Sequence, residues 1–265
     1  MASFNLTVED SSPLISYLPA GAWSYSGSSY HITSTQGATA TIAFNGTGLT
    51  IFGGHRTNYG TYQISVDGKV VASESSAGQN TVLQVMGTAS GLSNGQHTAI
   101  LTSSSASPID IDYVSIETEI GEPGYVLQQT IADASFVYTP QSEWSINDQD
   151  MFIDNTLHYT QSAGASASVT FSGEAVALYG TVSEDHADIR LLLDGESVTF
   201  GAGANGLAST LHTKILLYYA LGLSSNQHNL TVYADPSTNT GPFIDVDAVF
   251  VYSTWGLQSN ISFIL

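Results

Sequence analysis

Two stretches of the chain align without a gap: HITSTQGATATIAFNG at residues 31–46 and HYTQSAGASASVTFSG at residues 158–173. Their starting positions differ by 127 (158 − 31 = 127). In both stretches Ser and Thr alternate with Ala, Ile, Val and Phe, which is the period-two pattern of a strand with one buried face. A strand that recurs at a fixed offset indicates that one β domain occurs twice in the chain.

The repeat extends in both directions from this strand. Upstream, YLPAGAW (17–23) matches YTPQSEW (138–144). Downstream, GLSNGQH (91–97) matches GLSSNQH (222–228), and IDIDYVSI (109–116) matches IDVDAVFV (244–251). We therefore expect copy one at residues 1–120 and copy two at residues 121–265, joined by a short acidic linker around residues 117–124.

Each copy has the sequence pattern of many short strands. Asp-Gly pairs at 67–68 and 194–195 are hairpin signals between alternating segments. The stretch LHTKILLYYALGL (211–223) could form a helix, but its counterpart TVLQVMGTASGL (81–92) has a strand pattern, so we expect strands at both. The sequence predicts an all-β protein, a tandem of two homologous β-sandwiches of jelly-roll type.

Composition excludes several classes of partner. The chain has 265 residues, with Lys+Arg 4 against Asp+Glu 23, a formal net charge of −19. Nucleic acids and anionic membranes need clustered cations, so neither is an expected partner. No apolar run has the length of a membrane span, so we expect no membrane insertion, and the absence of cysteine rules out disulfides. Four sequons, at Asn5, Asn45, Asn229 and Asn260, favour a secreted or cell-surface glycoprotein.

Several motifs carry a resemblance to a known family. These are Tyr-x-Pro-x-x-x-Trp at the start of each copy, then YHITSTQGATATIAFNGTGLTIFGG, GTYQISVDG, GLSNGQHT and IDIDYV. Together they resemble a repeated extracellular domain of basidiomycete fungi, over nearly the whole chain. That domain is similar to the galactose-binding-like jelly rolls of carbohydrate-binding modules. The resemblance implies a β-sandwich that takes a saccharide or cell-wall glycan as partner.

One loop is the candidate ligand contact. FGGHRTNYGTY (52–62) concentrates polar groups between glycines, and the matched loop of copy two has different chemistry. Arg56 can make forked hydrogen bonds, Tyr59 can stack on a sugar face, and His55 and Asn58 can bond its hydroxyls. The alternative is an exposed loop whose arginine pairs with a carboxylate.

The acidic strands raise the question of a metal. Asp110, Asp112, Asp245 and Asp247 lie in strands that are apolar on both faces. Buried carboxylates need hydrogen-bond donors or a cation, so the alternatives are backbone N–H groups with hydroxyls, or calcium. The resemblance implies acidic partners for calcium in the first strand of each copy. At the constant offset of 127 residues, the acidic residues of the two first strands do not align with each other. They are Glu9 and Asp10 in copy one and Asp133 in copy two. We expect the metal-free arrangement, with no cofactor.

Residues kept at matched positions are predicted to serve the shared fold, as core aromatics and buried or strand-end histidines. The alternative roles are a platform for a sugar ring in the case of the aromatic residues and a metal ligand in the case of the histidines. The matched pairs are Tyr17/Tyr138, Trp23/Trp144, His31/His158 and His97/His228.

Three functions fit the sequence. The first is glycan binding or adhesion without catalysis, which we favour. The second is a structural surface protein that self-associates into homo-oligomers through its sandwich edges. The third is a glycoside hydrolase, for which Glu184, Asp185 and Asp188 are the candidate carboxylates.

Overall fold

The computed structural model describes residues 1–26, 29–78, 81–201, 208–234 and 243–256. Within these ranges the chain is built from strands β1 to β24, with three short 3-10 helices and no α-helix. The all-β prediction is therefore confirmed. The stretch 211–223, where helix and strand competed, contains strand β21 (His212–Leu221), also as predicted.

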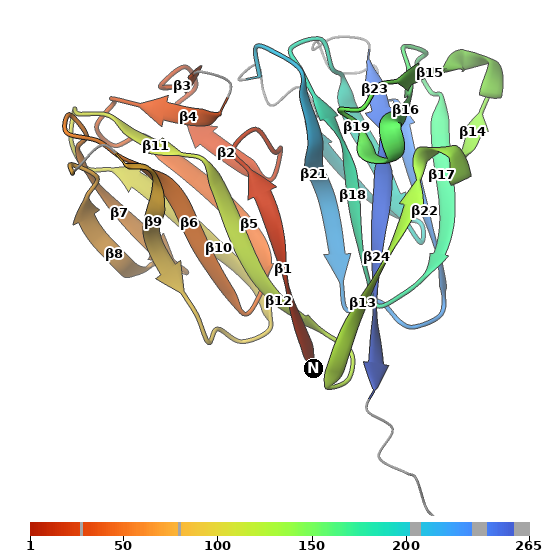
Figure 1. Cartoon of the computed structure of the whole chain (residues 1–265), viewed down its shortest axis with the longest axis horizontal. Helices are drawn as coiled ribbons and strands as arrows, with labels where there is room; N and C mark the ends of the chain where they lie inside the picture. Colours follow the sequence, from red (N-terminus) through yellow and green to blue (C-terminus); the bar gives the residue numbers. More distant parts are fainter. Residues whose placement is uncertain (27–28, 79–80, 202–207, 235–242, 257–265) are drawn as a thin grey trace, which may run out of the picture.

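Copy one comprises β1 to β12, which form two main antiparallel sheets and one small sheet (Figure 1). The four-stranded sheet has the order β1 (Ala2–Glu9), β12 (Tyr113–Ile120), β6 (Gly48–His55), β9 (Thr81–Ala89). The five-stranded sheet has the order β2 (Ile15–Leu18), β5 (Thr39–Gly46), β10 (Gly95–Ser103), β7 (Thr61–Val66), β8 (Lys69–Ser75). The three-stranded sheet has the order β11 (Ile109–Ile111), β4 (Tyr30–Thr33), β3 (Trp23–Ser26).

Copy two comprises β13 to β24 and repeats this arrangement. Its four-stranded sheet is β13 (Gly124–Ala132), β24 (Ala248–Gly256), β18 (Ala175–Val182), β21. Its five-stranded sheet is β14 (Val137–Thr139), β17 (Ser166–Ser172), β22 (Gln227–Ala234), β19 (Asp188–Leu193), β20 (Glu196–Gly201). Its small sheet is β15 (Trp144–Asp148), β16 (Thr156–Thr160), β23 (Ile244–Val246). The 3-10 helices are η1 (Asp133–Ser135), η2 (Gln141–Glu143) and η3 (Ile153–Asn155).

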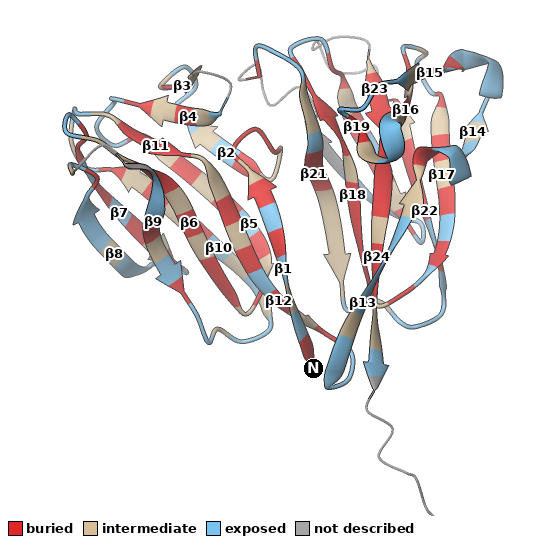
Figure 2. Ribbon diagram, viewed as in Figure 1, coloured by how far each residue is buried: buried red, intermediate tan, exposed pale blue. Residues whose placement is uncertain are grey.

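The core of each copy lies between its two main sheets. Along β5 the side chains of Ala40, Ile42 and Phe44 are buried, and those between them are more exposed. The same alternation runs along β17, so the period-two pattern that opened the sequence is a one-sided strand, as predicted. Figure 2 shows that buried residues follow the strands and that β8, at a sheet edge, is mostly exposed.

The predicted linker is shorter than expected. Strand β12 continues to Ile120, pairing Asn5 with Glu117 and Ala2 with Ile120 across β1. Strand β13 begins at Gly124, so only residues 121–123 connect the strands. Glu117 and Glu119 alternate with the buried Thr118 and Ile120, which is the pattern of a strand. The acidic composition of this segment had instead predicted a linker.

The two copies pack side by side along β1 and β21 (Figure 1). The rings of Phe4 and Tyr252 stack with centroids 4.4 Å apart. Ser12 Oγ donates to the carbonyl oxygen of Leu216 at 2.6 Å, across 204 residues of sequence. Buried apolar side chains of copy two join the core cluster of copy one, so the copies share apolar packing as well as a connection: Ala175, Ala177, Leu216 and Tyr252.

Candidate functional site

A buried carboxylate occupies a matched position in each copy. Asp110 on β11 is 1% exposed and Asp245 on β23 is 3% exposed. One carboxylate oxygen of each accepts a backbone N–H from the strand that precedes the variable loop. The donor is Gly54 for Asp110 and Thr181 for Asp245, the latter at 2.9 Å. The scaffold thus holds both carboxylates alike, and the remaining partners differ.

In copy one the second oxygen of Asp110 is bound by the predicted ligand loop. Arg56 Nη1 and Tyr59 Oη each donate to Asp110 Oδ2 at 2.6 Å. The guanidinium of Arg56 also lies over the ring of Tyr30, 4.9 Å from its centroid. A charge-assisted pair of this kind satisfies a buried carboxylate without a metal.

This arrangement corrects the expected chemistry of the loop. Tyr59 is 6% exposed, so its ring is not positioned to stack on a sugar, and Arg56 already binds a carboxylate. His55 is half-buried at the end of β6, whereas Asn58 is exposed. The structure brings Arg56 and Tyr59 together, but around Asp110 of their own copy.

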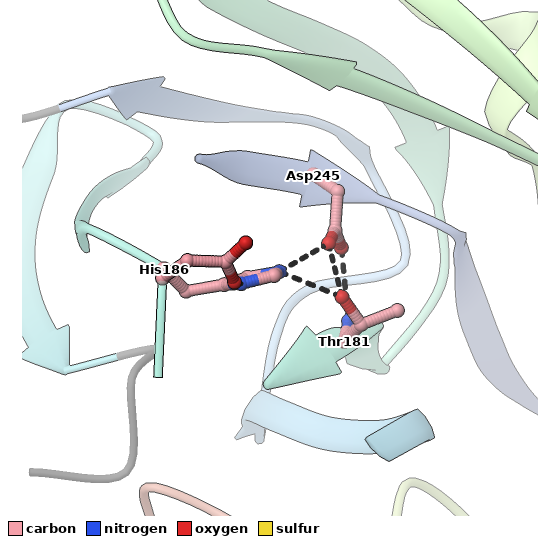
Figure 3. Close-up of polar contacts among 4 residues, drawn as sticks. Thr181, His186 and Asp245 are labelled. Atoms are coloured by element: carbon pink, nitrogen blue, oxygen red, sulfur yellow. Dashed lines mark hydrogen bonds and ion pairs between the residues drawn. The ribbon is translucent and has the colours of Figure 1, made fainter. Parts of the chain in front are cut away.

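In copy two the matched carboxylate has different partners (Figure 3). His186 Nε2 lies 2.8 Å from Asp245 Oδ2 and 2.8 Å from Thr181 Oγ1, and the Thr181 hydroxyl also bonds Asp245. The other ring nitrogen, Nδ1, lies 3.0 Å from Asp185 Oδ1. One imidazole therefore bridges a buried carboxylate and an exposed one, since the side chain of Asp185 is 54% exposed.

The protonation of this cluster follows from its contacts. Burial on its own lowers the pKa of His186, but its hydrogen bonds and charge interactions with Asp245 and Asp185 outweigh this and raise the pKa above the ordinary value. Partial burial tends to raise the pKa of Asp185, and its bonds to Ser183 and His186 reverse this and lower it. The cluster thus favours a charged imidazole beside an ionised Asp185.

Backbone hydrogen bonds establish which residues correspond. In copy one the N–H of Tyr59 donates to the carbonyl of Arg56 at 3.0 Å; in copy two the N–H of His186 donates to the carbonyl of Ser183 at 3.2 Å. His186 therefore stands at the position of Tyr59, and Ser183 at that of Arg56. Copy two has lost the arginine and gained the imidazole.

The residue at the end of the strand before this loop also differs between the copies: it is Gly54 in copy one and Thr181 in copy two. A Cβ atom added to Gly54 would overlap Nη1 at the end of the Arg56 side chain, so a larger residue at position 54 would make the guanidinium shift. At the matched position of copy two, where Ser183 replaces the arginine, Thr181 places its hydroxyl against the carboxylate.

A cleft of about 460 Å³ opens beside His186. Its walls combine apolar and aromatic side chains with amide, hydroxyl and carboxylate groups, and its size is within the range of small-molecule sites. The rings of Tyr159 and Phe243 lie on it with centroids 6.0 Å apart. The lining residues are Ile146, Asn147, Phe152, Leu157, Tyr159, Gln161, Thr181, Ser183, Asp185, His186, Leu211, Phe243 and Asp245.

Of the three candidate catalytic carboxylates, Asp185 lines this cleft. Glu184 is exposed and Asp188 begins β19, and neither is among the described residues that line the cleft. Asp245, considered from the sequence as a metal ligand, supplies the second carboxylate there. The two carboxylates are held on opposite ring nitrogens of His186.

The other two metal candidates are also buried or half-buried. Asp247 accepts the N–H of Ile153 at 2.9 and 3.2 Å, and burial raises its pKa to about 7. Burial, with the charges of Asp10 and Asp110, raises the pKa of Asp112 to about 6. The part of the chain that the structure describes contains no group of three or more His, Cys, Asp or Glu side chains arranged to hold a metal ion.

The first-strand acids correspond, contrary to the sequence offset. The N–H of Asp10 bonds the carbonyl of Asp112 at 2.9 Å, and that of Asp133 bonds the carbonyl of Asp247 at 2.9 Å. Asp10 lies 2.6 Å from His31 Nδ1, so its carboxylate is bound by its own copy's histidine. Asp133 has the same 2.6 Å contact with His158 Nδ1.

The other repeated residues also serve the shared fold. Trp23 and Trp144 are buried in the two cores. His97 lies 2.6 Å from Asp67, and its counterpart His228 lies 2.6 Å from Asp194 at the matched hairpin; both ring contacts tie β10 or β22 to a turn. Tyr17 stacks on His31 and Tyr138 on His158, with centroids 4.5 and 4.3 Å apart.

The sequons differ in setting. Asn5 and Asn229 are exposed, whereas Asn45 is half-buried, with its N–H bonded to Tyr219 Oη at 2.7 Å. Asn260 lies outside the described residues. Glycosylation at these positions stays a prediction.

The molecule is a tandem β-sandwich whose second copy carries a cleft with a carboxylate–imidazole–carboxylate cluster. No family model matches the chain. It is 29% identical over 218 residues to a Flavonifractor plautii protein named A type blood alpha-D-galactosamine galactosaminidase. The match covers 81% of this chain and 19% of that protein, so the chain spans less than a fifth of its relative.

Similar solved structures include carbohydrate-active proteins. A Paenibacillus xanthan lyase matches 96% of this chain and 25% of its own, at 16% identity and a TM-score of 0.34. The CBM36-1 domain of a xylanase from a Trinervitermes trinervoides hindgut metagenome matches 46% of this chain and 100% of its own, at 13% identity and a TM-score of 0.35. In the described part of the chain, no helix is long and apolar enough to cross a membrane.

Alignment of the two copies shows that the loop at residues 182–186 differs from its counterpart, but it does not identify Thr181 or His186 as partners of Asp245. The available signal was the paired exchange of Gly54 for Thr181 and of Tyr59 for His186 at the 127-residue offset. Tyr159 and Phe243 carried no signal of their own, since they meet only through the fold.

Proposed function

We propose that this protein binds a glycan without catalysis and that the cleft beside His186 is its ligand site. The observation that carries the proposal is the composition of that cleft. Tyr159 and Phe243 offer apolar faces for a sugar ring, while Asn147, Gln161 and Asp185 offer groups that bond hydroxyls. The relative's name, which refers to galactosamine, supports a carbohydrate as ligand.

The proposal includes an extracellular location. Low cation content and the exposed sequons at Asn5 and Asn229 suit a secreted or cell-surface glycan binder. Mass spectrometry of the protein from its native source tests this, because glycan mass on either asparagine requires passage through the secretory route.

Binding is tested with a glycan array followed by titration calorimetry on the best ligand. The Tyr159→Ala variant removes one ring from the cleft wall and should weaken binding about 5- to 10-fold, roughly 1–1.4 kcal/mol. Tyr125→Ala is the matched control, since Tyr125 is 69% exposed on β13 and is not among the cleft residues. Equal affinity for both variants would move the site elsewhere.

A hydrolase is the second candidate, because the relative is named as a galactosaminidase and Asp185 and Asp245 both line the cleft. Against it, Asp245 is tied to Thr181 and His186, so it is not free to protonate a leaving group. Release of reducing ends from the bound glycan, abolished by Asp185→Asn, would establish hydrolysis. A protein that neither binds nor cleaves glycans but forms ordered oligomers would favour the structural role.

A further inference from the structure

The two copies differ in charge at matched positions. Copy one has Arg56 beside Asp110, and an uncharged Asn58 two residues after the arginine. Copy two has Ser183 at the arginine position and Asp185 at the asparagine position. Going from copy one to copy two, the same part of the scaffold loses a cation and gains a carboxylate.

The cleft of copy two therefore has an excess of negative charge. The described residues that line it include two carboxylates and the imidazole of His186, and no Lys or Arg. With the imidazole charged, the three groups still sum to −1. Asp185 has a lowered pKa and a side chain that is 54% exposed, so an ionised carboxylate faces an incoming ligand. The net charge of −19 attracts cations at longer range.

Copy one shows what kind of group this position accepts. Its cation is a guanidinium bound to a buried carboxylate at 2.6 Å, with its carbon 4.9 Å from the Tyr30 ring centroid and 5.0 Å from that of Tyr59. In copy two, Thr181 occupies the place nearest the carboxylate. A ligand cation would therefore lie further out, beside Asp185.

We propose that the cleft of copy two binds an amino sugar through a free ammonium group, that is, a hexosamine unit without its N-acetyl group, with Asp185 as the partner of the ammonium. In copy one the chain's own Arg56 fills the matched position, so among the described residues this position is open in copy two. The ring of the sugar lies against Tyr159 and Phe243. This inference rests on the proposed glycan binding and names the class of glycan.

The test compares two probes that differ at the nitrogen. Glucosamine and galactosamine oligomers are titrated against their N-acetylated counterparts by calorimetry at about pH 6, where an amine is protonated. The free amines should bind at least 10-fold more tightly, and the preference should shrink as salt is raised. Equal binding of both forms would overturn the amine proposal and leave glycan binding intact; binding of neither would overturn both.

Asp185→Asn removes the carboxylate charge, and with it one of the two charges that raise the pKa of His186. It installs the residue that copy one carries at position 58, and its exposed side chain leaves the fold undisturbed. The variant should lose at least 10-fold in affinity for the free amine and change little for the N-acetylated form. An unchanged amine preference would refute the role of Asp185.

A transplant tests the correspondence between the copies. The triple variant Thr181→Gly, Ser183→Arg, His186→Tyr carries the residues that surround Asp110 in copy one. It should bind no free amine, while its melting temperature shows that it remains folded. Wild-type amine binding by the folded triple variant would overturn the proposal, and if the variant does not fold, Asp185→Asn still decides.

Discussion

Replacing Arg56 with Ala should destabilise copy one, because this side chain neutralises a buried carboxylate. Asp110 is 1% exposed and keeps two other donors, the Gly54 N–H and Tyr59 Oη. Removing one partner of a fully buried pair costs about 3–5 kcal/mol. Arg56 is 23% exposed at its side chain, so water screens and replaces part of the interaction. We expect a loss of about 1.5–3 kcal/mol, the range for hydrogen bonds to charged groups.

Urea unfolding followed by tryptophan fluorescence measures this loss, since Trp23 lies in the core of the same copy. For a chain of this length, 2 kcal/mol corresponds to a fall in melting temperature of about 4–8 °C. Arg190→Ala is the control. Arg190 is exposed and lies 4.9 Å from the Tyr233 ring centroid, an interaction worth about 0.5–1 kcal/mol.

If Arg56→Ala unfolds at the same urea concentration as Arg190→Ala, Arg56 does not stabilise Asp110, and the reasoning from the buried ion pair is wrong. The intermediate variant Arg56→Lys should recover part of the loss, because an ammonium restores the charge but not the planar geometry of the guanidinium.

Three further predictions concern the buried polar groups. Because the pKa of Asp247 is raised to about 7, its contribution to stability is complete below the ordinary value of 3.8 and is lost as the pH rises through 7. The melting temperature should therefore fall between pH 5 and pH 8. The fall should be smaller in Asp247→Asn, which has no carboxyl group to titrate at this position. Chelation with EDTA should leave the melting temperature unchanged, and a fall that calcium reverses would instead support a metal at the acidic strands. Tyr219→Phe removes the acceptor of the Asn45 N–H between the copies and should cost about 1 kcal/mol in urea unfolding, whereas an unchanged midpoint would show that water replaces the bond.

The sequence predicted the architecture well because the repeat is visible in alternating strands. The alternation within residues 31–46 predicted which side chains of β5 are buried, and the same alternation 127 residues later predicted those of β17. The ambiguous stretch at 211–223 was resolved by its counterpart at 81–92, since two copies of one fold must share element types.

The constant offset also explains an error. Asp10 and Asp133 differ by 123 positions, whereas His31 and His158 differ by 127 (133 − 10 = 123; 158 − 31 = 127). The connection between the first and fourth strands of copy two is thus four residues longer, so a gapless comparison misaligned the acids. Asp10 and Asp133 are equivalent because they make the same backbone hydrogen bond and the same contact with a histidine. These contacts are seen in the structure and not in the sequence.

The site was harder to predict because its parts meet through space. Arg56 and Asp110 are 54 residues apart, and composition could say only that the arginine would find one of many carboxylates. Its scarcity suggested a ligand contact, whereas the buried charge beside it gives a local structural reason for an arginine here. In copy two the fold brings Thr181, His186 and Asp245 together from separate segments, as Figure 3 shows, and a cleft opens beside them.

The overlap between a Cβ at position 54 and the Arg56 guanidinium constrains how one cluster could evolve into the other. Threonine at position 54 would make the guanidinium of Arg56 shift away from its place beside Asp110, and loss of the arginine leaves Asp110 short of a counter-charge. Each single change is therefore expected to weaken the cluster of copy one, whereas copy two binds its carboxylate with Thr181 and His186, so the effects of changes at these two positions are not expected to be additive.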